Sequence, residues 1–250
     1  MPKWDDEAIV VKVKNQGEKS LLLIALTKHH GKHLGWFNHR SKKTSMLQPG
    51  DLVKLTWSAR LSDQLGTFSA ELYQATVGKI IEDELKLSML SSFCSLLNFC
   101  IPERELCTKF YNISKNYLFN LLDETITQKQ LIENYLIWET HILKEVGIFL
   151  NLKKCVVSGL DKDLKFVSPK SGNAVSENFA GKYESKLLKL PKLLGGKDFL
   201  KGNELDDLIG SFNLTYYFLK KFFNSIDYNY AQSPFAARER LIDNIKVKFV

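Results

Sequence analysis

The stretch KSLLLIALTKHHGKHLGWFNHRSKKTSMLQPG occupies Lys19 to Gly50 and contains two runs of strand character. The first, Lys19–Thr27, is rich in leucine, and the second runs from Lys32 to about His39. The residues His29-His30-Gly31 separate them. A short connection that contains glycine between two apolar runs predicts a β-hairpin.

The same stretch is also unusual in charge. None of its 32 residues is acidic, although a quarter of the whole chain is charged. Two adjacent aromatic residues, Trp36 and Phe37, lie inside it. Its basic residues are Lys19, Lys28, His29, His30, Lys32, His33, His39, Arg40, Lys42 and Lys43. A positive field that contains stacking groups is what single-stranded nucleic acid requires of a protein, so the stretch predicts a nucleic-acid-binding face.

The aromatic pair cannot act as two stacking platforms. Successive side chains of a strand point to opposite faces, so Trp36 and Phe37 must diverge. At most one of them stacks on bases, and the other fills a core. The sequence leaves open which one is exposed, and it also allows both to serve packing alone.

Further strands extend the hairpin into a barrel. Ala8–Lys14 and Leu52–Trp57 alternate apolar and polar residues, and Gly66–Val77 follows at near-strand spacing. Arg40–Gln48 forms a polar, basic connection. Five strands within about 75 residues, joined by short turns and one long loop, predict a five-stranded OB-fold β-barrel over residues 1–80.

The hydrophobic period then becomes helical, which makes the chain an α+β protein of several domains. We expect helices over Glu84–Cys100, Pro102–Asp123 and Gln128–Gly147, a long helix from Asn203 with Asp206 completing a capping box, and a short one over Pro234–Arg240. Residues 151–200 hold the apolar pairs Val156-Val157 and Phe166-Val167 and predict an irregular hairpin insert. The expected domains are therefore 1–80 (barrel), 81–150 (helical), 151–200 (insert) and 201–250 (helical).

The net charge of +7 is concentrated in the first third of the chain. Residues 1–80 carry 12 basic and 7 acidic residues, whereas residues 81–250 carry 23 and 21. This asymmetry favours one polyanion-binding module, although a basic chain can also be merely soluble. The acidic start of the chain is no secretory signal, and the four cysteines form no C-x-x-C pair. We expect a cytoplasmic, nucleoid-associated protein without membrane contact.

Catalytic motifs do not emerge from the sequence. The histidine cluster has no carboxylate inside the acid-free stretch, and no H-E-x-x-H, G-x-S-x-G, P-loop or G-x-G-x-x-G motif after a strand is present. Paired acids such as Glu103/Glu105 and Asp206/Asp207 lie at helix starts, where capping explains them. We therefore expect a binding protein that is not an enzyme and needs no cofactor. A histidine-dependent metal hydrolase is the weaker alternative, and an OB-fold RNA-binding factor is a second one.

Several short motifs follow one another along nearly the whole chain. They are Gly17-Glu18-Lys19-Ser20, Thr27-Lys28-His29-His30-Gly31, Arg40-Ser41-Lys42-Lys43, Leu47-Gln48-Pro49-Gly50, Trp57-Ser58-Ala59-Arg60-Leu61, Leu65-Gly66-Thr67-Phe68, Pro102-Glu103-Arg104-Glu105, and Val167-Ser168-Pro169 with Gly172-Asn173-Ala174-Val175-Ser176. No single motif is specific alone, but their order and spacing together resemble the bacterial recombination mediator RecO, in its alphaproteobacterial style.

The resemblance implies an OB domain, a helical domain and a small zinc-finger-like insert. It also implies binding of single- and double-stranded DNA, strand annealing, and help in loading recombinase onto strands coated by single-strand-binding protein in the RecF pathway of DNA repair and recombination. The implied partners are RecR and the acidic C-terminal tail of the single-strand-binding protein. The DNA-binding candidates are Lys28, Lys32, Trp36, His39, Arg40, Lys42, Lys43 and Arg60. The partner-binding candidates, chosen by charge, are Arg104, Lys109, Arg238 and Arg240.

The chain departs from the family in its insert. Some relatives hold zinc there with two C-x-x-C pairs, but here only Cys155 stands at a ligand position and Ser158 occupies the second. One thiolate cannot build a tetrahedral structural site. We therefore expect no zinc and an insert held together by packing.

Overall fold

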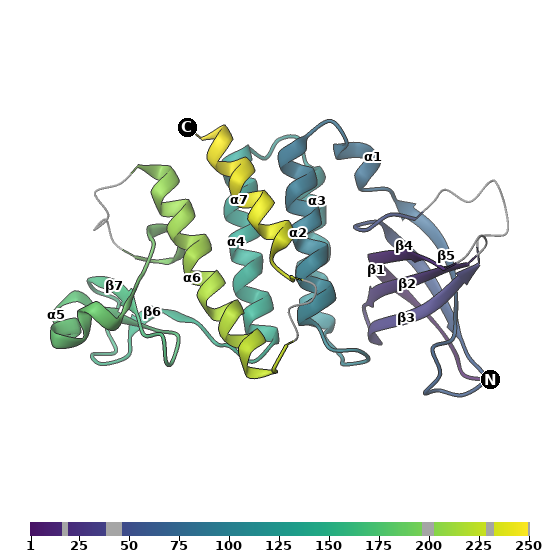
Figure 1. Ribbon diagram of the computed structural model, residues 1–250, viewed down its shortest axis with the longest axis horizontal. Coiled ribbons are helices and arrows are strands. Elements are labelled where there is room, and N and C mark those ends of the chain that lie inside the picture. Colours follow the sequence, from purple (N-terminus) through teal and green to yellow (C-terminus); the bar gives the residue numbers. More distant parts are fainter. Residues whose placement is uncertain (17–19, 39–46, 197–202, 229–232, 250) are drawn as a thin grey trace. The chain divides into compact units, whose positions relative to one another are not determined.

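The computed structural model describes residues 1–16, 20–38, 47–196, 203–228 and 233–249 (Figure 1). The chain forms two compact units. The first contains Met1–Ile126 and Ser233–Asn244, and the second contains Thr127–Gln232 and Ile245–Val250. The border between the units falls inside the expected helical domain 81–150, and the domain limits at 80, 150 and 200 remain predictions.

The first unit begins with a closed five-stranded barrel of order β1-β2-β3-β5-β4. All neighbours are antiparallel except β3 and β5, which are parallel. This order is that of an OB-fold, so the prediction of an OB-type barrel followed by a helical region is confirmed. The strands are β1 (Lys3–Asn15), β2 (Ser20–Thr27), β3 (Gly31–Asn38), β4 (Leu52–Ser58) and β5 (Thr67–Gln74).

The barrel core follows from strand alternation. In β2, Leu21, Leu23 and Ala25 point inward and are buried, whereas Leu22 and Ile24 are only half-buried. Residues from β1, β3, β4 and β5 complete the same apolar cluster. Its further buried members include Ala8, Val10, Phe37, Val53, Leu55, Trp57 and Phe68.

Strand β1 is longer than the alternation predicts. It begins at Lys3 rather than Ala8, because the residues from Lys3 to Ile9 pair with those from Ser58 to Leu52 of β4. The acidic residues Asp5, Asp6 and Glu7 therefore lie within a strand, although acidic residues disfavour strands. A bulge between Val10 and Lys12 shifts the register with β2.

Helices follow the barrel in the first unit. They are α1 (Val77–Ile80), α2 (Glu84–Cys100), α3 (Thr108–Leu122) and the part of α7 (Ala236–Lys248) up to Asn244. Helix α2 has the predicted limits, and Asp83 caps it by accepting a hydrogen bond from the Lys86 amide. Phe93 of α2 stacks on Tyr117 of α3, with ring centroids 5.0 Å apart.

Two helix limits differ from the predictions by more than two residues. Helix α3 begins at Thr108 and not at Pro102, because Glu103 forms a bridge with Lys32 of the barrel and the Arg104 amide donates to the Lys32 carbonyl. Those backbone groups are therefore not free to start a helix. Helix α7 runs past the predicted end at Arg240 as far as Lys248.

The second unit contains helices α4 (Gln128–Glu145) and α6 (Glu204–Ser225). Both begin with a capping box, and that of α6 joins Asn203 to Asp206 as predicted. The helices pack through Tyr135 of α4, which stacks on Phe212 of α6. The buried Glu139 carboxylate of α4 accepts a hydrogen bond of 2.6 Å from the Thr215 hydroxyl of α6.

The insert of the second unit is a small sheet rather than an irregular hairpin. Its strands β6 (Asn151–Cys155), β7 (Leu164–Val167), β8 (Asn173–Ser176) and β9 (Leu188–Lys189) are arranged in the order β6-β8-β7-β9. Helix α5 (Glu177–Ala180) and the short 3₁₀ helices η1 (Gly181–Lys186) and η2 (Lys192–Leu194) flank it. Phe166 and Val167 are buried in this sheet, but Val156 and Val157 are exposed in the turn after β6, so the predicted pair Val156-Val157 is not a core pair.

The donor groups around Cys155 do not suit zinc. The Cys155 sulfur accepts a hydrogen bond of 3.3 Å from the Ser176 amide. The Ser176 hydroxyl donates to the Lys162 carbonyl, and the Ser158 hydroxyl accepts from the Leu160 amide. Burial raises the pKa of Cys155, but hydrogen bonds from Ser176 and Ser158 outweigh it and bring the pKa to about 6. The thiolate is therefore stabilised by protein donors, and only one soft ligand is available for a metal.

No helix in the described part of the chain is both long enough and apolar enough to cross a bilayer.

The insert should fold without zinc. We expect protein purified without chelators to carry far less than one zinc per chain by elemental mass spectrometry, because one thiolate cannot close a tetrahedral site. Its thermal midpoint should be the same before and after EDTA treatment, since no metal contributes to folding. One zinc per chain, lost together with stability on chelation, would contradict this account.

Candidate nucleic-acid interface

The outer face of β1, β2 and β3, which we call the open face, carries lysines, half-buried apolar residues and an exposed aromatic residue. Pairing aligns Lys14 with Leu22 and Leu22 with Trp36 across the three strands. The next outward row aligns Lys12 with Ile24 and Ile24 with Leu34 in the same way. Lysines of β1 therefore border a half-buried apolar strip that ends at an exposed tryptophan.

The structure decides which aromatic residue of β3 is exposed. The Phe37 side chain is 5% exposed and belongs to the barrel core, whereas Trp36 is 39% exposed. The backbone of Trp36 is joined to the residue before β5, because the Trp36 amide donates to the Gly66 carbonyl at 3.0 Å. Trp36 is thus the one possible stacking platform of the pair.

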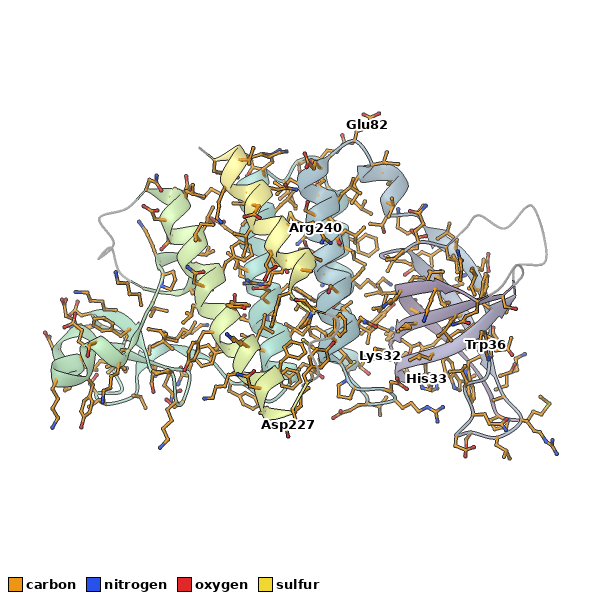
Figure 2. All side chains as sticks on the ribbon, viewed as in Figure 1. Lys32, His33, Trp36, Glu82, Asp227 and Arg240 are labelled. Carbon is orange, nitrogen blue, oxygen red and sulfur yellow. The ribbon has the colours of Figure 1, made fainter. Side chains whose placement is uncertain are left out.

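Lys32 lies at the other end of β3, and its side chain is not at the surface. It is only 7% exposed, and its ammonium donates to the Asn98 carbonyl of α2 at 2.6 Å. Burial lowers the pKa of Lys32. Figure 2 shows Lys32 at the end of the barrel near the helices and Trp36 at the far end of the strand. The expectation that Lys32 contributes to an exposed cationic face is therefore wrong.

Arg60 lies beside Trp36. Both residues line a shallow depression of about 360 Å³ whose floor includes Ser58, Gly66 and Thr67. Arg60 is exposed. A planar aromatic ring and a guanidinium on one depression can engage a base and a phosphate of the same strand.

Arg104 holds the turn that leads into this depression. Its guanidinium donates to the carbonyl oxygens of Ser62, Asp63 and Gln64, at 2.9, 3.1 and 2.9 Å. These three residues form the turn that follows Arg60. Arg104 is exposed, and its guanidinium donors hold this turn, which makes it a positioning residue; its role as a partner contact stays a prediction.

Lys28 lies in different surroundings. It lines a depression of about 600 Å³ that also contains Asp5, Asp6, Glu7 and Glu71. Its amide donates to the Glu7 carbonyl, and its carbonyl accepts from the Thr108 hydroxyl of α3. The structure therefore does not bring Lys28 to the depression of Trp36 and Arg60, and the depression that Lys28 lines also contains four carboxylates and Lys54.

His29, His30 and His33 make contacts within the barrel. The Asp6 carboxylate accepts hydrogen bonds from the His29 amide at 2.7 Å and contacts the ring nitrogens of His29 and His30. The His30 ring stacks on Trp4 with centroids 4.0 Å apart. His33 is buried, and burial, with Arg104 and His30 nearby, lowers its pKa to about 4. No group of three metal-binding side chains occurs among the residues that the structure describes.

Four of the predicted DNA contacts, His39, Arg40, Lys42 and Lys43, lie outside the described residues. They follow directly on β3, the strand that presents Trp36. Their contacts with DNA stay a prediction.

The remaining partner candidates differ in exposure. Lys109 on α3 and Arg240 on α7 are exposed. Arg240 lines a depression of about 340 Å³ with Glu84 and Asp243, and it is labelled in Figure 2. Arg238 is only 2% exposed, so its side chain is not presented to a partner, and the charge-based prediction for it is wrong.

Sequence reasoning missed two residues of the open face, Lys12 and Lys14. The signal was present, because both alternate with the inward residues of the predicted strand. Both lysines precede the acid-free stretch in the sequence. The pairing of β1 with β2 places them beside residues of that stretch.

Comparison with known proteins gives consistent matches along the chain. Residues 1–75 match the family model "Recombination protein O N terminal", and residues 81–224 match "Recombination protein O C terminal". The DNA repair protein RecO of Rhodospirillum centenum is 34% identical over 248 residues, which are 98% of this chain and 95% of the relative. That of Ruegeria sp. is 38% identical over 196 residues, 78% of this chain and 80% of the relative. That of a Wolbachia strain from Drosophila simulans is 34% identical over 192 residues, with 77% and 79% covered.

Replacing Asp6 with asparagine should destabilise the barrel at neutral pH. Burial raises the pKa of Asp6, but hydrogen bonds from His30, His29 and Glu7 lower it by more, so the folded pKa lies below 3.8. A depressed carboxyl pKa contributes stability above its unfolded value, and this contribution disappears as the pH falls through the folded value. Urea unfolding at pH 7 should show a loss of roughly 1.5–3 kcal/mol for D6N, from hydrogen bonds to a charged group.

The difference between wild type and D6N should shrink when unfolding is measured below pH 4. The matched control is D63N, since Asp63 is exposed and is engaged through its backbone carbonyl. Its effect should stay within about 0.5 kcal/mol. Equal stability of D6N and D63N at pH 7 would show that the carboxylate does not organise the turn.

Proposed function

The chain belongs to the recombination protein O family, and we propose from this membership that it is a DNA repair protein that binds single- and double-stranded DNA and anneals complementary strands. We further propose that it helps to load recombinase onto strands coated by single-strand-binding protein. In this proposal the chain acts by binding rather than by catalysis.

The observation that carries the proposal is the exposed Trp36 beside Arg60 on one depression of an OB-type barrel. Barrels of this class bind single strands with an aromatic platform and a cationic groove. Lys12 and Lys14 extend the cationic border along the same outer face. This combination suits a ligand that offers both bases and phosphates.

The chemistry of the open face favours binding without strong sequence preference. Lysine and arginine contacts to phosphates release counterions and carry no base information. Stacking on one tryptophan is also tolerant of sequence, because every base has a π-face. A protein that anneals arbitrary complementary strands needs this kind of recognition.

Annealing requires that the repulsion between two phosphate backbones be reduced. Cations of the open face neutralise part of the charge on a bound strand, and they leave its unstacked bases able to pair. We propose that the chain lowers the barrier to pairing in this way.

For its protein partners we propose RecR and the acidic C-terminal tail of the single-strand-binding protein. Lys109 and Arg240 are the exposed cations that we retain for the acidic tail. Arg240 shares its depression with Glu84 and Asp243, so an acidic tail would have to compete with these carboxylates. Arg238 is not part of this proposal, because its side chain is buried.

Replacing Trp36 with alanine should weaken binding of a fluorescein-labelled oligo(dT) by roughly 1–3 kcal/mol, the contribution of one stacked base. W36F should retain most of the affinity, because phenylalanine keeps an aromatic face. The matched control is F119A, which removes another exposed aromatic residue from the same unit, on α3. Fluorescence anisotropy at fixed salt measures all three. If W36A and F119A bind as tightly as wild type, Trp36 does not face DNA.

The segment after β3 gives a second test. Changing Arg40, Lys42 and Lys43 together to alanine should weaken DNA binding and flatten its salt dependence. The slope of log K against log salt should fall by up to roughly 0.7–0.9 for each phosphate that the variant no longer neutralises. A triple variant with the wild-type slope would place this segment away from DNA. Repeating the series with an RNA strand of the same sequence distinguishes a DNA mediator from an RNA-binding factor.

A further inference from the structure

The insert of the second unit is a second concentration of positive charge. Residues 149–196 contain nine lysines and four acidic residues, although residues 81–250 as a whole are nearly balanced. The balance arises because acidic residues gather elsewhere, for example at Glu204, Asp206 and Asp207 in the first turn of α6. The insert, which carries the labels β6, β7 and α5 in Figure 1, is thus a cationic module of its own.

Three of its lysines follow one another along η1 and β9. Lys182 and Lys186 lie in η1, and Lys189 lies in β9, which is an edge strand of the small sheet. All three are exposed. Within a 3₁₀ helix, residues three apart project on the same side, so Tyr183 and Lys186 share one side of η1.

Aromatic rings accompany these lysines at the surface. Tyr183 is 56% exposed and Phe179 is 49% exposed. The Lys182 ammonium lies 5.4 Å from the centroid of the Tyr183 ring. Large aromatic side chains that pack no core and alternate with cations are the signature of a surface that stacks bases and contacts phosphates.

The charge of these lysines is not cancelled within the described protein. Lys165 is paired with Glu177, which uses one of the four acids of the insert. No ion pair joins Lys182, Lys186 or Lys189 to a residue that the structure describes. Glu184 is the one acidic residue between positions 178 and 192. The field around η1 and β9 is therefore positive and open to an anionic partner.

We propose that the insert surface, formed by Phe179, Lys182, Tyr183, Lys186 and Lys189, binds a second nucleic-acid strand. The inference rests on the proposed function, because it assigns one strand to the barrel and another to the insert. Lysines alone would suit any polyanion, including an acidic peptide. The two exposed rings among them favour a ligand with bases, since stacking gives them a partner that a peptide of acidic residues does not offer.

Two separate surfaces also give annealing a physical basis. A protein with one cationic face gathers a single strand, whereas two faces bring two strands to the same molecule and raise their local concentration. Each strand is partly neutralised where it is held. Pairing then becomes a reaction between strands that are already bound to one chain.

The test uses the full chain, a donor-labelled oligo(dT) and an acceptor-labelled oligo(dT), which cannot pair with each other. Wild type should bind two strands per chain and bring the dyes together, which energy transfer and titration both detect. K182A/K186A/K189A should bind one strand and lose the energy-transfer signal at least about tenfold, while the affinity for the first strand stays within about twofold. The salt slope of the second binding step should flatten by up to roughly 0.7 per lysine removed.

Two further variants make the result specific. The triple arginine variant K182R/K186R/K189R keeps the charge and should retain bridging. K144A/K154A/K220A removes three other exposed lysines of the second unit and should behave as wild type. Thermal midpoints of all variants check folding.

The inference would be overturned if K182A/K186A/K189A still bridged two strands, or if the control triple K144A/K154A/K220A lost bridging equally. Wild type that binds one strand tightly but never two would refute the inference and leave the proposed function intact. Wild type that binds no DNA would instead refute the proposed function.

Discussion

Lys32 is the residue on which the arrangement of the first unit depends. Its carbonyl accepts a hydrogen bond from the Arg104 amide, and its ammonium donates to the Asn98 carbonyl at the end of α2. One residue of β3 thus holds both the helix α2 and the connection to α3 against the barrel. The bridge also places the Arg104 guanidinium under the turn that carries Arg60. A buried ammonium is costly unless its donors are satisfied, so these contacts have to form together.

The contacts of Lys32 with the helices cover one end of the outer face of β2 and β3 and leave the other end exposed. Near Lys32 and Leu26 the face is buried, whereas towards Trp36 the same strands stay open. Charge divides the barrel in the same way, because the acidic residues Asp5 and Glu71 lie in the depression that contains Lys28. On the barrel, the face around Trp36 therefore offers a polyanion an open cationic approach with an aromatic group, and this approach is the DNA site that we propose for the first unit.

Sequence patterns predicted the barrel well, because alternation in each strand marks a single buried face. They also required Trp36 and Phe37 to diverge, but only the register between β2 and β3 shows that Trp36 is the exposed one. The burial of Lys32 could not be read locally, since it depends on the Asn98 carbonyl 66 positions away in the chain. Charge summed over residues 81–250 concealed the cationic insert, since acids at helix starts cancelled its lysines in the count.

The start of α3 shows the same limit for local rules. Proline is favoured at the first position of a helix, so Pro102 predicted a helix start there. The backbone of Glu103 and Arg104 instead pairs with β3, a tertiary contact that overrides the local preference. The capping box at Asn203 was predictable because all its atoms come from four consecutive residues.

The most direct measurement is photo-crosslinking of the full chain to an oligonucleotide that carries 4-thiothymidine, with the attachment sites mapped by mass spectrometry. The account predicts a principal barrel crosslink at Trp36 or in the turn that contains Arg60. Barrel crosslinks confined to the side of Asp5, Lys54 and Glu71 would contradict it, because DNA would then occupy the acidic depression and not the open face.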